Sequence, residues 1–215
     1  MKIILNEGHI NTVCLLEAMK EGFSIETLKS LPSFAKKRAY CKQMLGNSIG
    51  KGSSREVYQI DDEKILKLAM NNKGIAQNEV EADWGLQNYG VVPKLFDSDD
   101  DGLFIIAEYV LPAKEADFQH CFNMNFNDFC RFIAGCCNLY LSKPIRYGLD
   151  SKTVTNLCNS NQQLYSFMMY ITDYQPPYGD VTAIRNYGLT QRNNQPTIVL
   201  LDSGLNNEVW NDFYK

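Results

Sequence analysis

Apolar residues recur every three to four positions along the first part of the chain, which predicts helices there. Residues 11–23, "NTVCLLEAMKEGF", would place four apolar side chains on one helical face. Residues 24–31 begin with a serine suited to capping a helix, and residues 33–45 form another amphipathic stretch after Pro32. Residues 1–45 are therefore predicted to be an N-terminal helical extension.

From Glu56 onward the apolar pattern changes to a period of two, which is typical of β-strands. The segments "REVYQI" and "KILKLAM" are predicted to be strands joined by a turn over residues 61–64. Residues 71–90 are predicted to be a loop that leads into a helix, which ends at the last of them. Residues 91–110 are predicted to be two more strands around an acidic turn. Residues 46–111 are thus expected to form a small β-rich half with one helix.

After Pro112 the pattern becomes mostly helical. Residues 125–141 and 156–174 are helix-like, and residues 197–206, "TIVLLDSGLN", are predicted to be a short buried strand followed by a turn. Residues 112–215 are therefore expected to be a mostly helical half, which makes the predicted fold class α+β. A two-part layout of this kind leaves a cleft between its halves, where ligands are commonly bound.

Composition and charge limit the classes of function. The 215 residues are 45% apolar and 21% charged, which is typical of a soluble globular protein. A net charge of −4 argues against general nucleic-acid binding, which requires a basic surface. The apolar runs are too short to predict a signal peptide or a membrane-spanning helix. Seven cysteines without a C-x-x-C pair predict reduced thiols in a cytoplasmic protein, or in the host cytoplasm if the chain is viral.

A glycine-rich segment, residues 46–60 ("GNSIGKGSSREVYQI"), precedes the first predicted strand. It does not fit the G-x-x-x-x-G-K-[ST] phosphate loop, because its glycines are one residue too close together and it leads into a strand. The G-x-G-x-x-G-x-V loop that lies over ATP matches at Gly50, Gly52 and Val57. Arg55 stands where the third glycine would be. A plain surface hairpin is the alternative interpretation.

Lys67 lies inside an apolar predicted strand, where an unpaired charge is costly. The strand that follows an ATP-covering hairpin carries a lysine that reaches the phosphates, which suits Lys67. The alternatives are that its side chain extends to the surface, or that Lys64 in the preceding turn takes the role. A carboxylate partner would come from the next helix, at Glu79 or Glu81. These two positions face different directions, so only one of them can point at the lysine.

Oxygen-bearing side chains gather in the last third of the chain. Asp180 and Asn186 lie in one predicted loop, and Asp202 ends an apolar strand and is followed by Ser203-Gly204. Carboxylate and amide oxygens suit Mg²⁺, which prefers hard oxygen ligands and keeps several waters. The alternative is that both aspartates only cap turns.

The order of these motifs resembles the protein kinase-like superfamily, over about residues 46–205. The sequence looks most similar to the aminoglycoside phosphotransferases and to short kinase-like proteins encoded by bacteriophages. The resemblance implies a bilobal fold with a truncated helical lobe, and ATP and Mg²⁺ as cofactors. The sequence departs from the family at Tyr178, which replaces a histidine, and at Ser203, which replaces a phenylalanine. The Asp…Asn spacing is one residue longer than usual, and residues 191–196 form an unusually long predicted hairpin.

The resemblance also implies roles for individual residues. Lys67 would hold the α- and β-phosphates and pair with Glu79, whose distance to "VVPKLF" resembles that of the helix glutamate in the aminoglycoside kinases. Asp180 would be the catalytic base, with Lys67 as the second catalytic residue. Asn186 and Asp202 would bind Mg²⁺. The implied nucleotide-binding residues, including the hinge between the lobes, are Gly50, Gly52, Ser53, Val57, Lys67, Glu79, Glu108 and Tyr109.

Two functions are compatible with this sequence. One is an ATP- and Mg²⁺-dependent phosphotransferase that transfers the γ-phosphoryl group to a hydroxyl acceptor, in which positioning and charge neutralisation supply most of the catalysis. The other is a pseudokinase that binds a nucleotide or a host or viral protein partner without turnover. Arg55, the altered loop spacing and the short helical half favour the second function. The sequence predicts neither the acceptor nor the oligomeric state.

Overall fold

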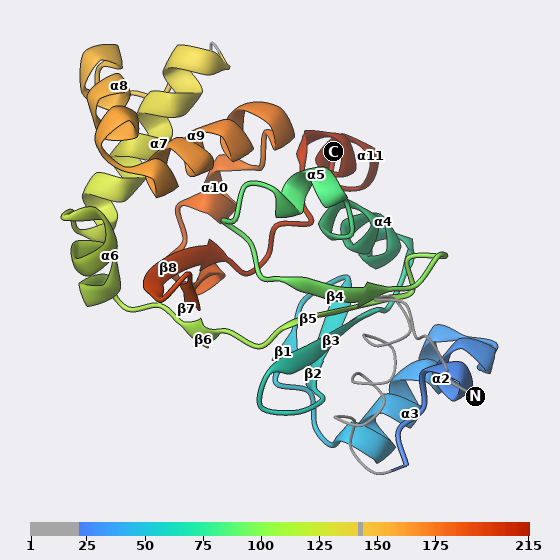
Figure 1. The fold of residues 1–215 in the computed structure, drawn as a ribbon. Coiled ribbons are helices and arrows are strands. Elements are labelled where there is room, and N and C mark those ends of the chain that lie inside the picture. The colour runs from blue at the N-terminus through green and yellow to red at the C-terminus, as the bar shows by residue number, and fades with distance from the viewer. Residues whose placement is uncertain (1–21, 142–143) are drawn as a thin grey trace, which may run out of the picture.

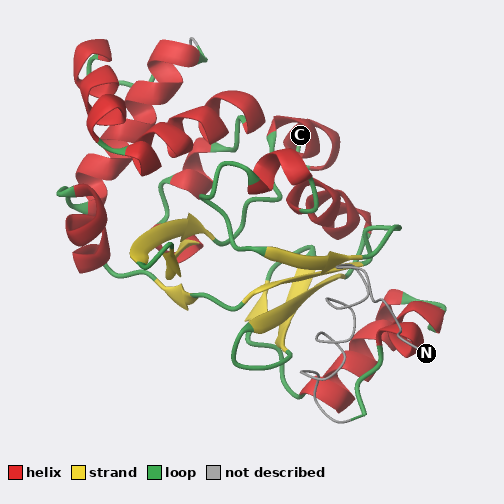
Figure 2. Cartoon of the chain, in the orientation of Figure 1, coloured by secondary structure: helices red, strands yellow, loops and turns green. Residues whose placement is uncertain are grey.

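The structure, a computed structural model, describes residues 22–141 and 144–215 and is of the α+β class (Figure 1). A five-stranded sheet lies toward one end, a group of helices toward the other, and a three-stranded sheet between them (Figure 2). The predicted helix over residues 11–23 lies almost entirely outside the described residues. In chain order the elements are α2 (Ile25–Ser30), α3 (Phe34–Leu45), β1 (Gly50–Lys51), β2 (Arg55–Gln59), β3 (Lys64–Ala69), α4 (Asn72–Glu81), α5 (Trp84–Gln87), β4 (Leu95–Ser98), β5 (Phe104–Glu108), β6 (Leu111–Pro112), α6 (Glu115–Phe122), α7 (Phe126–Tyr140), α8 (Ser151–Ser160), α9 (Gln162–Tyr174), α10 (Tyr178–Val181), the 3₁₀ turn η1 (Ile184–Asn186), β7 (Tyr187–Arg192), β8 (Gln195–Leu200) and α11 (Asn207–Phe213).

The five-stranded sheet is antiparallel, with the strand order β1-β2-β3-β5-β4. The two strands predicted from the period of two are confirmed as β2 and β3, and β3 lies at the centre. Lys67 is paired with Val57 on β2 and with Ile105 on β5. Because side chains alternate along a strand, Lys67 points to the opposite face from its neighbours Leu66 and Leu68.

Helices α2 and α3 cover one face of this sheet (Figure 1). The serine cap predicted for the helix in residues 24–31 is confirmed in α2, because the Ser24 hydroxyl oxygen accepts a hydrogen bond of 3.1 Å from the Thr27 N–H. The two helices are part of the core of the β-rich half. That core contains Phe23, Leu28, Cys41, Leu45, Tyr58, Ile60, Leu66, Leu68, Phe104 and Ile106.

Helix α4 packs on the opposite face of the sheet, which is the face of Lys67 (Figure 1). The prediction of one helix ending at Gly90 is wrong, since α4 ends at Glu81 and the short helix α5 follows. Asp83 explains the break. Its backbone is extended, and its side chain accepts a hydrogen bond of 2.9 Å from the Gly85 N–H, which starts a new helix.

The helical half has a core rich in aromatic side chains between α6, α7 and α9. The prediction of one helix over residues 156–174 is wrong, because Asn161 separates α8 from α9. Asn161 has the extended dihedral angles φ −141° and ψ 110°, and its side chain caps α9 by accepting from the Gln163 and Leu164 N–H groups. The buried aromatic residues of this core are Phe118, Phe122, Phe129, Phe132, Phe167, Tyr170 and Tyr187.

Strands β6, β7 and β8 form the small sheet that connects the two halves. Residues 191–196 form the tip of the predicted hairpin, in which Arg192 and Gln195 are paired and only two residues join the strands. These two, Asn193 and Asn194, have φ values of 51° and 61°. Asparagine tolerates this left-handed conformation, and two such residues form the tight turn that matches the twist of a hairpin.

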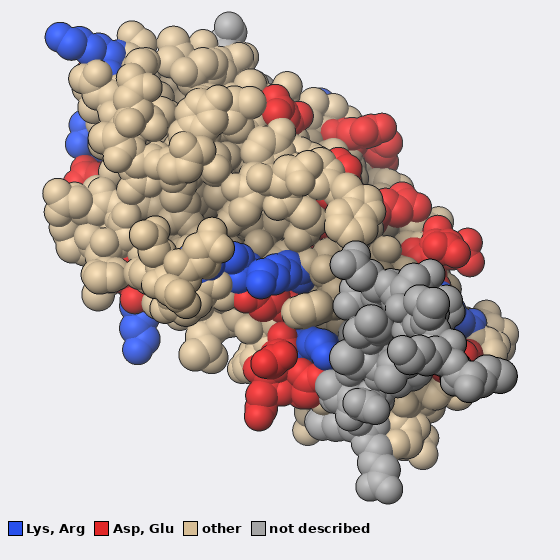
Figure 3. Space-filling model, viewed as in Figure 1, with Lys and Arg blue, Asp and Glu red and all other residues tan. Residues whose placement is uncertain are grey.

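Charged side chains are unevenly distributed on the face of the molecule in Figure 3. The helical half presents mostly uncharged side chains there, whereas acidic and basic side chains lie next to each other where the two halves meet. In residues 22–141 and 144–215, no helix combines the length and the apolar character needed to cross a membrane.

Candidate functional site

Buried charges meet where β3, α4 and the end of β8 come together. The Lys67 ammonium nitrogen Nζ lies 2.5 Å from Oε2 of Glu81 and 2.7 Å from the carbonyl oxygen of Leu201. The side chains of Lys67 and Glu81 are only 5% and 6% exposed. Lys67 is therefore a buried cation with a carboxylate partner, and the interpretation that it extends to the surface is wrong.

The predicted partner of this lysine, Glu79, does not take part in the pair. Glu79 is exposed, whereas Glu81 is the last residue of α4 and is buried. The two glutamates lie two positions apart on a helix and point in different directions, so the helix can bring only one of them to Lys67. The prediction of a Lys67–Glu79 pair is therefore wrong, and Glu81 takes that place.

Arg55 is a member of the site that the sequence interpretation missed. Its guanidinium group donates hydrogen bonds to Asn78 Oδ1 at 3.2 Å and to Glu81 Oε1 at 2.8 Å, and it forms an ion pair with Asp202. The sequence contained a usable signal. In a strand, Arg55 lies on the same face as Val57, two positions further on, and thus on the face that points to α4.

Positive and negative groups alternate through the site, in the order Lys67, Glu81, Arg55 and Asp202. Burial alone would raise the pKa of Glu81, but the adjacent Arg55 and Lys67 hold it below its usual value. Glu81 is therefore ionised at neutral pH. The Asp202 side chain is 55% exposed, so this end of the network is accessible to solvent.

Asn186 lies beside the segment that follows β8 and carries Asp202, and Asp180 is bonded to Asn186. Asn186 Nδ2 donates to the Asp180 carbonyl oxygen at 2.9 Å, and the Asn186 carbonyl accepts from the Leu201 N–H at 2.7 Å. Burial raises the pKa of Asp180, nearby Asp202 raises it further, and Arg185 opposes the shift. Asp180 belongs to the short helix α10, and Asn186 is the last residue of the 3₁₀ turn η1.

Tyr170, on α9, is buried next to these acidic groups. Burial raises the pKa of its hydroxyl well above the usual value, and the charges of Glu81, Asp202 and Asp180 add to the effect. Among the described residues the hydroxyl has no hydrogen-bond partner. The Tyr170 hydroxyl therefore stays protonated at neutral pH.

The glycine-rich segment forms a β1–β2 hairpin, closed by a hydrogen bond of 2.9 Å from the Gly52 N–H to the Arg55 carbonyl. Neither Gly50 nor Gly52 has a positive φ. A Cβ atom on Gly52 would meet only the Arg55 carbonyl oxygen, at 3.9 Å, and one on Gly50 would make ordinary contact with Val57. The fold therefore does not require glycine at either position. Ser53 is exposed at the tip of the hairpin.

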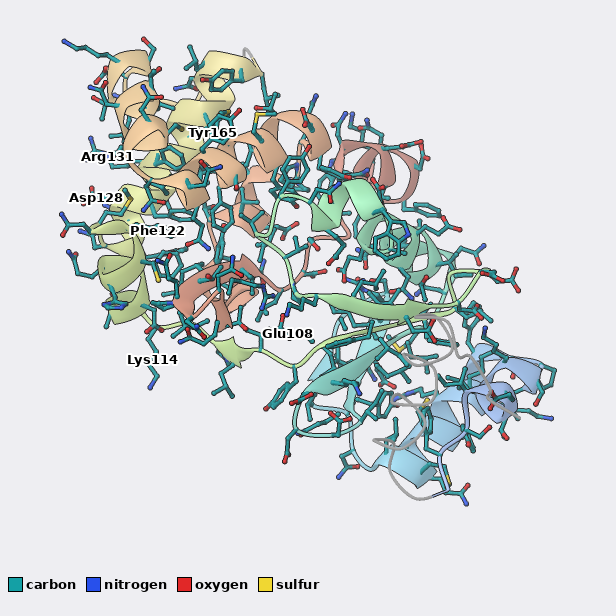
Figure 4. The ribbon with its side chains drawn as sticks, viewed as in Figure 1. Glu108, Lys114, Phe122, Asp128, Arg131 and Tyr165 are labelled. Carbon is teal, nitrogen blue, oxygen red and sulfur yellow. The ribbon has the colours of Figure 1, made fainter. Side chains whose placement is uncertain are left out.

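Glu108, at the end of β5, connects the two halves of the molecule (Figure 4). Its carboxylate accepts from the Thr190 hydroxyl at 2.6 Å and from Arg192 at 2.8 Å, both on β7. Its N–H is bonded to the Lys94 carbonyl, and the Tyr109 N–H is bonded to a carbonyl on the preceding hairpin. The backbone N–H groups of Glu108 and Tyr109 are therefore both already bonded. The prediction that these two residues donate backbone hydrogen bonds to adenine is wrong.

The oxygen donors for a metal ion are few. Among the described residues, no group of three or more His, Cys, Asp and Glu side chains is placed to hold a metal. Asn186 Oδ1 and the Asp202 carboxylate supply two hard oxygens. Mg²⁺ is commonly bound by one or two carboxylates together with phosphate oxygens and water, so the donor type fits Mg²⁺. Two donors do not make an all-protein site.

Five of the cavities in the described part of the chain have volumes between 170 and 580 Å³. The largest of these five is lined by Asn138 and residues 144–146 on the helical half. None of the five is lined by Lys67, Arg55 or Asp202. At the junction, Arg55 and Asp202 are instead in direct contact.

The structure brings together four of the predicted site residues, Lys67, Asp180, Asn186 and Asp202, and adds Glu81 and Arg55 to them. No known protein family, curated protein or solved structure matches the chain. The geometry of these side chains is therefore the basis on which a function is assigned.

Proposed function

We propose that the chain is a kinase-like phosphotransferase, which uses ATP and Mg²⁺ and transfers the γ-phosphoryl group to a hydroxyl acceptor. One observation carries the proposal. Lys67, on the central strand of the sheet, is held by Glu81 and contacts the carbonyl of Leu201, the residue directly before Asp202. A cation from one half of the molecule thus lies beside metal-type oxygen donors of the other half, as phosphoryl transfer requires.

Lys67 would bind phosphate with the donor that its partners leave. An ammonium group has three N–H donors, and Glu81 and the Leu201 carbonyl accept two of them. Gly50 and Gly52 support the same role for the hairpin. The fold needs glycine at neither position, whereas a backbone without side chains allows a phosphate group to approach closely.

Asp180 would accept the proton of the acceptor hydroxyl. Its carboxyl group is half-buried, and its pKa is raised by burial and by Asp202, which makes it a stronger base than an exposed aspartate. Mg²⁺ would supply charge neutralisation on the phosphates, and Asn186 and Asp202 are the residues that would hold it.

Val110 is the residue whose backbone N–H would donate a hydrogen bond to adenine. It follows Tyr109 at the connection between the halves, and its N–H has no hydrogen-bond partner among the described residues. The N–H groups of Glu108 and Tyr109 are already bonded. Val110 is therefore the available backbone donor at this connection.

The test compares two lysines of the same strand, Lys67 and Lys64. We expect Lys67→Gln to weaken ATP binding at least about tenfold, since it removes a charge–phosphate contact worth about 1.4 kcal/mol or more. Lys64→Gln should change the affinity less than about twofold. The dissociation constants would be measured by calorimetry with Mg²⁺ present, after circular dichroism has shown that both variants fold. Equal effects of the two substitutions would refute the proposed site.

The transfer step is tested separately with γ-labelled ATP and a panel of hydroxyl acceptors and proteins. Asp180→Asn should abolish transfer but leave ATP binding within about threefold, because Asp180 acts on the acceptor and not on the nucleotide. Transfer that persists in this variant would exclude Asp180 as the base.

A second function, nucleotide or protein-partner binding without turnover, is favoured by one observation. The Arg55–Asp202 ion pair uses part of the carboxylate that a metal ion would need. ATP binding by the wild-type chain together with no transfer to any acceptor would favour this function over catalysis.

A further inference from the structure

Arg55 holds a permanent positive charge next to the carboxylate of Asp202, which is the carboxylate that the proposed function assigns to Mg²⁺. The Arg55 side chain is 7% exposed, and its guanidinium group bridges Glu81 and Asp202, which belong to different halves of the molecule. Arg55 also contacts Asn78, so its position is fixed from β2, α4 and the end of β8. An arginine is charged at every pH at which the chain is folded.

The guanidinium group and a divalent cation cannot both use Asp202 without cost. Two like charges a few ångströms apart repel each other, and the Arg55 side chain is itself largely shielded from water. The ion pair with Arg55 also offsets the negative charge that would attract a metal ion. Asn186 alone is an uncharged and therefore weak ligand, so the affinity for metal depends on Asp202.

We propose that Arg55 is an internal competitor of the divalent metal ion at Asp202, so that metal binding requires the Arg55–Asp202 ion pair to separate. This inference rests on the metal site of the proposed function. It assigns to Arg55 the control of that site, and it explains why a buried arginine occupies the hairpin position that glycine would occupy in the resembling family. The Glu81–Arg55 contact can persist when Asp202 is released, since it uses a different carboxylate.

The experiment measures Mn²⁺ binding alone, without nucleotide, from the electron paramagnetic resonance signal of the free ion. We expect Arg55→Gln to bind Mn²⁺ at least about tenfold more tightly than the wild type, because Asp202 loses its competing partner. Asp202→Asn in the Arg55→Gln background should remove this gain. Arg38→Gln is the matched control, since Arg38 pairs with the buried Glu56 on the other face of the sheet and should leave the affinity within about twofold.

A second variant covers the case in which Arg55→Gln does not fold. Arg55→Lys keeps the positive charge that Glu81 requires. It lacks the planar guanidinium group with its fixed N–H donors, so its single ammonium group cannot bridge Glu81 and Asp202 in the same way. It should therefore also tighten Mn²⁺ binding. Affinity within about twofold of the wild type in the folded Arg55 variants would overturn the inference, as would a gain that survives Asp202→Asn. Because no nucleotide is present, neither result depends on whether the chain binds ATP.

Discussion

At the scale of single residues, Glu81 accepts three hydrogen bonds in the site, as many as Arg55 donates. Its two oxygens accept from Lys67 and Arg55, and one of them also accepts from the Gly204 N–H at 3.0 Å. The Glu81 carboxylate balances the buried positive charges of Lys67 and Arg55. Without it, each of them would lose one partner. Stability and site geometry therefore depend on the same residue.

A substitution at Glu81 should accordingly be costly. We expect Glu81→Gln to lower the free energy of unfolding by about 3–5 kcal/mol, the usual effect of removing one partner of a buried ion pair. Glu79→Gln, at the exposed neighbouring glutamate, should change it by no more than about 0.5 kcal/mol. Urea denaturation of both variants measures the difference. Similar losses in the two variants would contradict the assignment of Glu81 as the partner of Lys67.

Asp180, unlike Glu81, makes the folded state less stable at neutral pH when its carboxyl group is ionised. Its pKa is raised in the folded chain, so the folded state holds the proton more tightly than the unfolded state. The favourable contribution is present below the unfolded pKa of about 3.9 and is lost as the pH rises through the folded value. Asp180→Asn should therefore gain thermal stability relative to the wild type as the pH rises from about 3 to 7. A difference that is independent of pH would show that the carboxyl group is not perturbed.

The sequence could identify some of these residues and not others. Lys67 stands out because it interrupts an apolar strand, and Asp202 because it follows one. A charge in such a position costs free energy unless it has a partner. The choice between Glu79 and Glu81 depends on how α4 is rotated against the sheet, and no local pattern contains that rotation. Arg55 was read as a departure from a glycine motif because its partner Asp202 lies 147 positions further along the chain.

At the scale of elements, the turn after Asp202 is fixed by its close approach to α4. A Cβ atom on Gly204 would lie 2.4 Å from the carbonyl oxygen of Gln77, a distance at which the backbone must move. The glycine of the Asp-Ser-Gly motif is thus required by the packing of this turn on α4. The same turn donates the Gly204 N–H to Glu81.

We expect Gly204→Ala to destabilise the chain by about 2 kcal/mol or more, as overpacking against backbone does. Gly179→Ala is the matched control. A Cβ atom there meets nothing within 4 Å, and alanine favours the short helix α10 that contains it. Thermal unfolding should therefore show a loss for the first variant and no loss for the second. Equal midpoints would mean that the turn can shift away from α4.

The strands with a clear local pattern were predicted correctly. The breaks between helices, which depend on single polar side chains, were not. Strands β2 and β3 were found because a period of two and a polar turn agree. The breaks at Asp83 and Asn161 were missed because a helical apolar pattern continues across both. The helices α6 and α11 are too short for periodicity to indicate them.

At the scale of the whole molecule, Glu108 and β7 hold the two halves together. The Glu108 carboxylate binds Thr190 and Arg192, and the charged pair is largely buried, with 15% and 18% exposure of its side chains. These contacts join residues more than 80 positions apart in the chain. Periodicity cannot foresee such a pairing, although the α+β class could be predicted from the change of pattern near Pro112.

Removal of this connection should loosen the junction of the halves. We expect Arg192→Gln to lower the free energy of unfolding by about 2–3 kcal/mol, since it leaves a largely buried carboxylate without its charged partner. Arg131→Gln, which breaks an exposed pair with Asp128 on one helix, should cost less than about 0.5 kcal/mol. Urea denaturation distinguishes the two variants. A loss below about 0.5 kcal/mol for Arg192→Gln would mean that the bridge does not stabilise the junction.

The packing of α2 and α3 on the sheet has a consequence for any attempt to shorten the chain. A fragment that begins at Gly46 would keep every predicted motif and yet expose the apolar side chains of β2, β3 and β5 that these helices shield. Bare surfaces of this kind associate with each other, so such a fragment would precipitate or self-associate even with its chemistry intact. The smallest soluble unit therefore extends upstream of the motifs by at least the length of both helices.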